Sequence, residues 1–167
     1  MNTIRELIIL EFMARAAVIR TTGSPQAYAT DIGENVVRAR KTLDADELPA
    51  IVIWPMSEES QNMYGMAKHI MTLRAEGICK FGTDNPSVIS ERILGDLIKC
   101  FTSPLWDRRR LVESPESPVT YLQPYADSIV YKSGGLESAL DDGAVSVGSQ
   151  AGFDVTYWTK IGDPYSQ

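Results

Sequence analysis

The sequence predicts an α+β domain, in which a mixed, mostly antiparallel sheet carries two helices packed on one face. Two observations lead to this prediction. The order of the patterns is helix, strands, helix, strands, and the closing run Phe153–Lys160 alternates residue by residue and is rich in aromatic and β-branched side chains. No repeat or linker divides the 167 residues, so we expect a single domain over 1–167.

The first element is a helix that begins after Thr3. Thr3 and Glu6 have the spacing of a capping box, in which each side chain satisfies a backbone amide of the other residue. On a helical projection one stripe is apolar, and the opposite side carries Arg5, Glu11 and Arg15; the stripe consists of Leu7, Leu10, Met13, Ala14 and Ala17. Ile8 and Phe12 flank the narrow polar side, so the helix is either a deeply covered core helix or packs on a neighbouring molecule as well as on its own sheet.

Residues 21–35 form the next feature, a long loop with no sustained period. It contains Gly23, Pro25, Asp31 and Gly33, which are typical of turns, and loops of this length often carry function. We expect this extended loop, with Tyr28 and Asp31, to serve as an interaction arm.

Strands are expected next. Residues 36–43 alternate apolar and basic side chains, 44–47 form an acidic turn, and 48–55 are an apolar run bounded by prolines, which predicts a strand covered on both faces. Residues 57–62 are predicted to form a polar turn. Residues 66–81 suit either a helix or a long strand, and Gly77 in mid-run favours the strand.

A second helix should begin at Asn85-Pro86, an N-cap followed by proline at the first helical position. We expect it to end before Pro104 and to bury one apolar face: Val88, Ile89, Ile93, Leu94, Leu97, Ile98 and Phe101. Turn signals follow at 113–118, 133–135 and 141–143. Beyond the last strand, Gly162 and Pro164 end the pairing and predict an extended C-terminal hook, residues 161–167, that is free to contact a neighbour.

Composition and charge narrow the classes of function. The net charge is −6, which disfavours a nucleic-acid-binding surface, because such affinity comes from neutralising phosphates with Lys and Arg. The longest apolar-rich run, 4–19, contains four charged residues, so we expect a soluble, unexported protein without membrane contact. Cys79 and Cys100 have no second ligand nearby and are expected to be reduced thiols.

Catalytic patterns are absent from the sequence. His69 is the only histidine, and it lies in an apolar alternation with no nucleophile motif close by. Phosphate-binding and dinucleotide-binding glycine motifs are missing, and the cysteines and histidine lack zinc-ligand spacing. Arg108, Arg109 and Arg110 are either solvated or contact a phosphate or an acidic neighbour. We therefore expect no catalytic, cofactor or metal site, and a small enzyme or ligand-binding domain that uses His69 and a carboxylate remains an alternative.

Four features together resemble the tail terminator proteins of long-tailed bacteriophages, the family that includes the minor tail protein U of phage lambda. They are the apolar N-terminal helix, the basic strand that leads through an acidic turn into Glu47–Ile51, the helix opened by Asn85-Pro86, and the closing Val155–Tyr157 strand with the tail Gly162–Tyr165. The chain departs from the family in its 21–35 loop and its proline-rich 113–118 segment.

The resemblance implies an α+β virion subunit that is not an enzyme and needs no cofactor. It implies a homohexameric ring at the head-proximal end of the tail, assembled in the host cytoplasm, that stops polymerisation of the tail tube protein and joins a head-side connector protein. DNA would pass through the lumen without specific binding. The residues expected at subunit or partner interfaces are Ile8, Phe12, Arg15, Tyr28, Asp31, Arg108, Arg109, Arg110, Asp163 and Tyr165. Another neck protein, for head closure or head-to-tail joining, is the nearest alternative.

Overall fold

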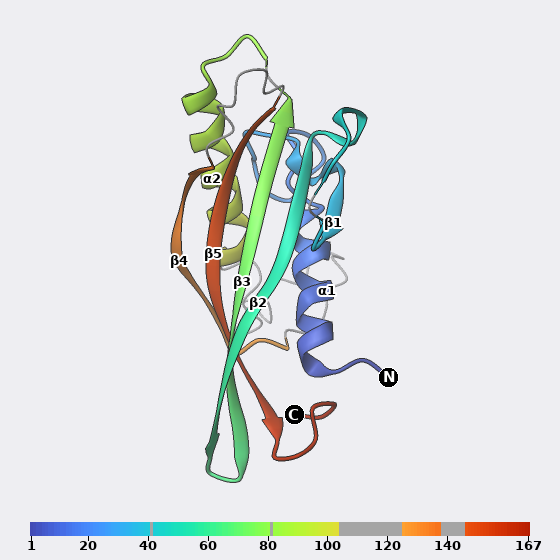
Figure 1. Ribbon diagram of the computed structural model, residues 1–167, viewed down its shortest axis with the longest axis vertical. Coiled ribbons are helices and arrows are strands. Elements are labelled where there is room, and N and C mark those ends of the chain that lie inside the picture. The colour runs from blue at the N-terminus through green and yellow to red at the C-terminus, as the bar shows by residue number, and fades with distance from the viewer. Residues whose placement is uncertain (41, 81, 104–124, 138–145) are drawn as a thin grey trace.

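The computed structural model describes residues 1–167 except 41, 81, 104–124 and 138–145 (Figure 1). Its helices are α1 (Ile4–Ala16) and α2 (Pro86–Thr102), with short 3-10 turns η1 (Ile32–Glu34) and η2 (Ala45–Glu47). Its strands are β1 (Val36–Arg38), β2 (Ala50–Met63), β3 (Met66–Lys80), β4 (Ser128–Glu137) and β5 (Ser146–Lys160). This is the predicted α+β class.

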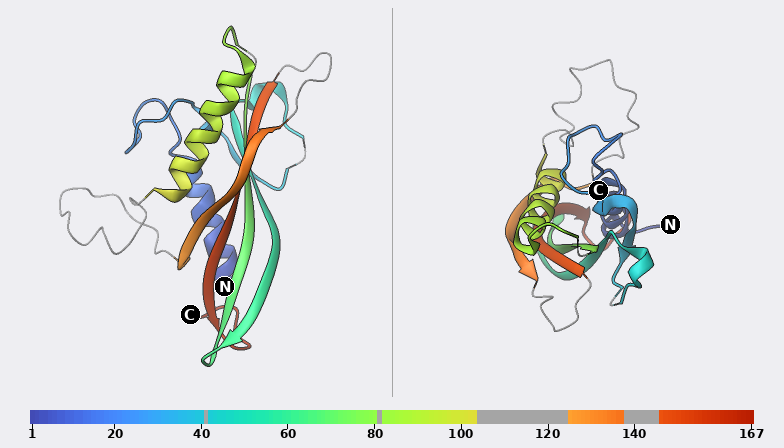
Figure 2. Two further views of the ribbon diagram at one scale, coloured as in Figure 1. Left: turned by 90° about the vertical axis from the view of Figure 1, so that its left-hand side faces the viewer. Right: turned by 90° about the horizontal axis from the view of Figure 1, so that it is seen from above.

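The five strands form one sheet in the order β1-β2-β3-β5-β4. Only β1 and β2 run parallel; the other three pairs are antiparallel. Both helices lie against the same face of this twisted sheet, as Figure 2 shows from two directions. The mixed, mostly antiparallel sheet with two helices on one face is therefore confirmed, and no helix of the described residues lies over the opposite face of the sheet.

Three phenylalanines form the centre of the core between the helices and the sheet. Phe12 of α1 stacks on Phe101 of α2 with ring centroids 4.6 Å apart, and Phe153 of β5 meets Phe101 edge-on at 5.1 Å. All three are at most 1% exposed. Since the burial of a large aromatic side chain is a major source of stability, this contact is what holds the two helices and the sheet together.

The buried face of α1 is not the predicted stripe. Leu10 is 43% exposed, whereas Ile8 and Phe12 are fully covered by the chain itself. The reason is that Glu11 and Arg15, which the projection places on the polar side, form an ion pair inside the protein, with side chains only 5% and 6% exposed. Thr3 caps the helix as predicted by accepting a hydrogen bond from the Glu6 amide, but the Glu6 carboxylate binds Arg38 at 2.7 Å instead of completing a capping box.

Strands β2 and β5 are longer than predicted, β3 covers 66–80 of the predicted 66–81, and β1 ends at Arg38. Residues 57–62, expected as a turn, continue β2 and pair with β3, and the turn lies at Tyr64-Gly65. Residues 66–80 are the long strand that Gly77 favoured, and residues 133–135, expected as a turn, lie within β4. The run 50–53 is buried on both faces, as expected.

The second helix matches its prediction more closely. The Asn85 side chain accepts a hydrogen bond from the Ser87 amide at 2.9 Å, and Pro86 opens the helix. Ile93, Leu97 and Phe101 are fully buried, whereas Val88 is 45% exposed. Asp96, a residue with no predicted role, is also buried on this helix at 5% exposure.

Candidate functional site

The far half of the β2–β3 hairpin, residues 57–72, which we call the hairpin arm, has an exposed β2 strand. It extends past the helices to one end of the molecule (Figure 1). Its tip, Tyr64-Gly65, has positive φ at both residues, 52° and 80°, as the tightest hairpin turns require. Tyr64 is 96% exposed. Because β1 pairs with β2 only at Ile51–Ile53, the arm's β2 edge has no partner strand among the described residues.

A β-bulge at the base of the arm turns Glu58 towards the helix side of the sheet. Pro55 pairs with Leu73, and the next pair is Glu58 with Met71, so two residues of β2 lie opposite the single residue Thr72 and β2 carries one extra residue. Leu73 and Met71 both face the core. Bulges commonly redirect a side chain in this way, and here the bulge gives Glu58 partners from three other elements.

The partners of Glu58 are Tyr157 of β5, Arg5 of α1 and His69 of β3. The Tyr157 hydroxyl donates to Glu58 Oε2 at 2.6 Å, Arg5 Nε lies 3.4 Å from the same oxygen, and His69 Nδ1 lies 3.4 Å from Oε1. The His69 ring stacks on Tyr157 at 4.7 Å, and its Nε2 is 2.9 Å from Thr159 Oγ1. Burial and the neighbouring Glu58 carboxylate raise the pKa of Tyr157, so the phenol stays protonated and acts as a donor.

This polar cluster joins the base of the arm to α1 and β5. His69 and a carboxylate do come together, as the enzyme alternative requires, and the sequence did not indicate which carboxylate. Only the bulge brings Glu58 to this face, and a bulge leaves no clear mark on an alternating pattern. His69 is held by the contact of its Nε2 with Thr159 and by its stacking on Tyr157, whereas its Nδ1 forms no hydrogen bond among the described residues.

The C-terminal hook packs on its own subunit, contrary to the expectation of a free extension. The Ile4 amide donates to the Pro164 carbonyl at 2.9 Å, the Lys160 amide to the Ser166 carbonyl at 3.1 Å, and the Gln167 side chain to the Tyr125 carbonyl at 2.6 Å. Asp163 accepts hydrogen bonds from Ser166 and from the Tyr165 amide, which lower its pKa. The hook therefore closes the end of the fold beside the start of α1.

The 21–35 loop is likewise held by the subunit. The Asp96 carboxylate accepts hydrogen bonds from the amides of Ala29 and Thr30, and Thr21 binds Asp31 through its amide at 2.8 Å. Gly33 lies so close to α1 that a Cβ there would be 2.5 Å from the Ala16 carbonyl oxygen. A buried carboxylate thus fixes the backbone of this loop, and a role for the loop in contacts with a partner stays a prediction.

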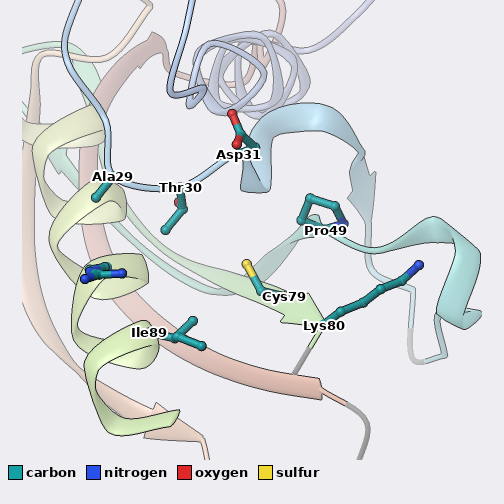
Figure 3. Close-up of a pocket in the computed structure, with 8 residues that line it drawn as sticks. Ala29, Thr30, Asp31, Pro49, Cys79, Lys80 and Ile89 are labelled. Atoms are coloured by element: carbon teal, nitrogen blue, oxygen red, sulfur yellow. The ribbon is translucent and has the colours of Figure 1, made fainter. Parts of the chain in front are cut away.

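A cavity of about 290 Å³ lies between this loop, the end of β3 and α2 (Figure 3). Its lining includes Thr30, Pro49, Cys79, Ile89 and Arg92, and it does not include His69. Burial is the main cause that raises the pKa of Cys79 to about 11, so its thiol is protonated and a poor nucleophile at neutral pH. Cys100 is buried, and neither cysteine forms a disulfide.

Several residues predicted at interfaces belong to the core. Ile8, Phe12, Arg15 and Tyr28 are between 0% and 7% exposed, because the sheet, α2 and the 21–35 loop cover them; their assignment to an interface is corrected. Asp31 is half-buried, and its carboxylate accepts a hydrogen bond from the Thr21 amide. Asp163 is half-buried in the hook, Tyr165 is 44% exposed, and Arg108, Arg109 and Arg110 lie outside the described residues.

Exposed apolar side chains occur on the arm, at its base and on the hook, and also elsewhere on the surface, at Leu10, Val88, Val130 and Leu136. Tyr64 is 96% exposed, Ile161 52%, Tyr165 44%, Met56 44% and Ile70 37%. Of the residues predicted at interfaces, Tyr165 is exposed at the end of the molecule that carries the arm and the hook; the arm was not predicted, because residues 57–62 were expected to form a turn. This end is the candidate assembly surface.

No protein-family model matches the chain, and no curated protein sequence does so either. Within the described residues, neither helix is long and apolar enough to cross a membrane. That same part of the chain gathers no group of three or more His, Cys, Asp or Glu side chains able to hold a metal ion.

Proposed function

We propose that the chain is a structural subunit of a phage tail, a terminator that forms a homohexameric ring, caps the tail tube and joins it to the head-side connector. The observation that carries the proposal is the hairpin arm: an ordered hairpin reaches past the core with an unpaired β2 edge and a fully exposed tyrosine at its tip. A long free edge can act as a template for another strand.

Two further features support an assembly role. Tyr64 and Ile70 of the arm and Tyr165 of the hook expose apolar surface, and exposed apolar surface can bind other proteins. A head-to-tail contact that closes after a fixed rotation gives a ring, and a specific contact needs on the order of 1,000 Å² of buried area. The net charge of −6 would let DNA pass through a lumen without being retained.

Electron microscopy of the purified protein, alone and mixed with tail tubes, tests the proposal. Discrete rings, or a ring at one end of each tube, are expected. A protein that stays monomeric at high concentration and leaves tube ends bare would overturn it. Deletion of the gene separates the neck-protein alternative: loss of a terminator gives over-long or unstable tails, whereas loss of a head-closure protein gives normal tails and leaking heads.

The contact of Glu58 with His69 favours a second candidate, a small enzyme or ligand-binding domain. A His69→Ala variant separates the two. Loss of folding stability alone indicates a structural cluster. An intact fold and ring that no longer turn over a substrate found by screening the native protein would favour the enzyme.

A further inference from the structure

The two edges of the sheet have matching lengths. β1 covers β2 only as far as Ile53, which leaves the ten residues Trp54–Met63 as one free edge among the described strands. The other edge is β4, Ser128–Glu137, which also has ten residues. Each edge presents unpaired backbone donors and acceptors that another strand can bind.

Their directions also match. β2 is antiparallel to β3 and β3 to β5, so β2 and β5 run the same way, and β4 is antiparallel to β5. β4 is therefore antiparallel to β2. When copies are related by rotation about an axis roughly along the strands, β4 of one copy meets β2 of the next in the antiparallel sense, which is the more stable pairing per residue.

We infer that residues Glu59–Met63 of one copy pair antiparallel with Ser128–Lys132 of the next, with Glu59 opposite Lys132 and Met63 opposite Ser128. The occupant of the arm's free edge is thus a second copy of this chain. The inference rests on the proposed function, because it names the contact between subunits of the ring.

Charge selects this register. Glu59 is exposed and forms no ion pair within the described part of the subunit, and Lys132 has a side chain 57% exposed. Asp154, 3.2 Å from Lys132, occupies only one side of that ammonium group. Two residues further along β2 from Glu59, Gln61 would lie opposite Val130 of the next copy. Both belong to the face away from the helices, since Gln61 pairs with Lys68 and Val130 pairs with Asp154. The pairing therefore keeps core-facing and outer positions in line.

The offset between copies gives the same ratio of shear to strand number as one known closed barrel. Within one subunit Ser128 is level with Glu59, through Thr156 and Ile70. The inferred pair of Ser128 with Met63 shifts the next copy by four residues over the four strands β2, β3, β5 and β4. Equal shear and strand number is the ratio of the eight-stranded barrel, whose strands tilt by about 36°.

The same edge rejects the wrong partner. Two β2 edges in contact would bring Glu58 and Glu59 of both copies together, and like charges on facing strands destabilise a pair. N-terminal to this segment, Pro55 has no backbone N–H to donate, and the bulge interrupts the pattern of strand hydrogen bonds. Pairing is thus confined to the C-terminal part of β2, Glu59–Met63, and to the β4 edge, which carries the cation of Lys132.

Engineered disulfides test the register. Gln61→Cys and Val130→Cys in one chain should cross-link neighbouring copies up to a closed ring on mild oxidation. Within one subunit the two positions are separated by β3 and β5, about 14 Å, which is beyond the roughly 7 Å that a disulfide can bridge. Each single variant should give no cross-linked oligomers. The pair Ser57→Cys with Val130→Cys, which is four residues out of register, should give none either.

Light scattering on the same samples tests ring formation separately from the inferred contact between strands. A ring that forms without a Gln61–Val130 cross-link overturns the inferred contact and leaves the proposed function standing, whereas no ring overturns both. Glu59→Lys should weaken ring formation by at least tenfold in concentration, and Lys132→Glu added to it should restore the ring. Glu91→Lys, the same charge change on the exposed side of α2, should leave assembly unchanged; a loss there equal to that of Glu59→Lys would contradict the pairing.

Discussion

Asp96 Oδ2 accepts hydrogen bonds from both the amide and the hydroxyl of Thr30, at 2.8 and 2.7 Å. The amide of Ala29 donates to the same carboxylate at 3.0 Å. A single carboxylate on α2 therefore satisfies three donors of a loop that would otherwise be buried without partners. This contact makes the 21–35 loop part of the core structure.

Replacement of Asp96 by Asn should destabilise the protein by about 1–3 kcal/mol, because the amide group directs its own donors at donors of the loop. The free energy of unfolding in urea measures the effect. Asp84→Asn is the matched control: Asp84 binds only the exposed Arg92, at 2.8 Å, and should change stability by less than about 0.5 kcal/mol. Equal effects of the two substitutions would contradict the role given to Asp96.

Phe12→Ala should cost about 3–5 kcal/mol, because it removes a 1% exposed ring stacked on Phe101 and leaves a cavity. Leu10→Ala on the same helix should cost far less, since Leu10 is 43% exposed. Thermal or urea unfolding of both variants compares them. The reverse ranking would mean that α1 presents the opposite face to the sheet.

Gly77→Ala should destabilise the fold by about 1–3 kcal/mol through overpacking. A Cβ at this position would lie 2.6 Å from Ile93 Cγ2 and 2.9 Å from Ile32 Cδ1, both in the core. Gly95→Ala provides the control, because no atom lies within 4 Å of its Cβ position and alanine favours a helix by up to about 1 kcal/mol. The two alanine variants should therefore shift the melting temperature in opposite directions.

The buried thiol of Cys100 should make stability fall at high pH. Burial is the largest cause that raises its pKa to about 12, from an ordinary value near 9. The unfolded chain therefore loses this proton first as the pH rises above about 9, and the folded state is favoured less and less up to about 12. The free energy of unfolding in urea should be measured against pH across this range for the native protein and for Cys100→Ala. It should fall less steeply with pH in the variant; identical slopes would refute the raised pKa of Cys100.

The sequence predicts the class of fold, α2 and the strands through capping residues and alternation. It predicts the wrong face of α1, because Glu11 and Arg15 were taken as the solvent side. Their mutual ion pair lets both side chains enter the protein beside Phe12. A projection that counts charges as exposed cannot show that two opposite charges one turn apart will be buried together.

The hairpin arm escapes prediction for a different reason. Residues 57–62 are polar because the arm extends beyond the core, and they form a strand because their backbone pairs with β3. Hydrogen bonds of this kind require no apolar pattern. Similarly, Gly134 lies in β4 because a Cβ there would be 2.6 Å from the Gln150 carbonyl oxygen and 2.7 Å from Leu94 Cδ1, so the glycine marks close packing rather than a turn.

The molar mass in solution tests the central claim most directly. Size-exclusion chromatography with light scattering, at protein concentrations up to the millimolar range and in the presence of tail tube ends, should give a species six times the 18.5 kDa of one chain. A mass of one chain under every condition, with no protein retained on the tubes, would contradict the account of this chain as a ring-forming tail subunit.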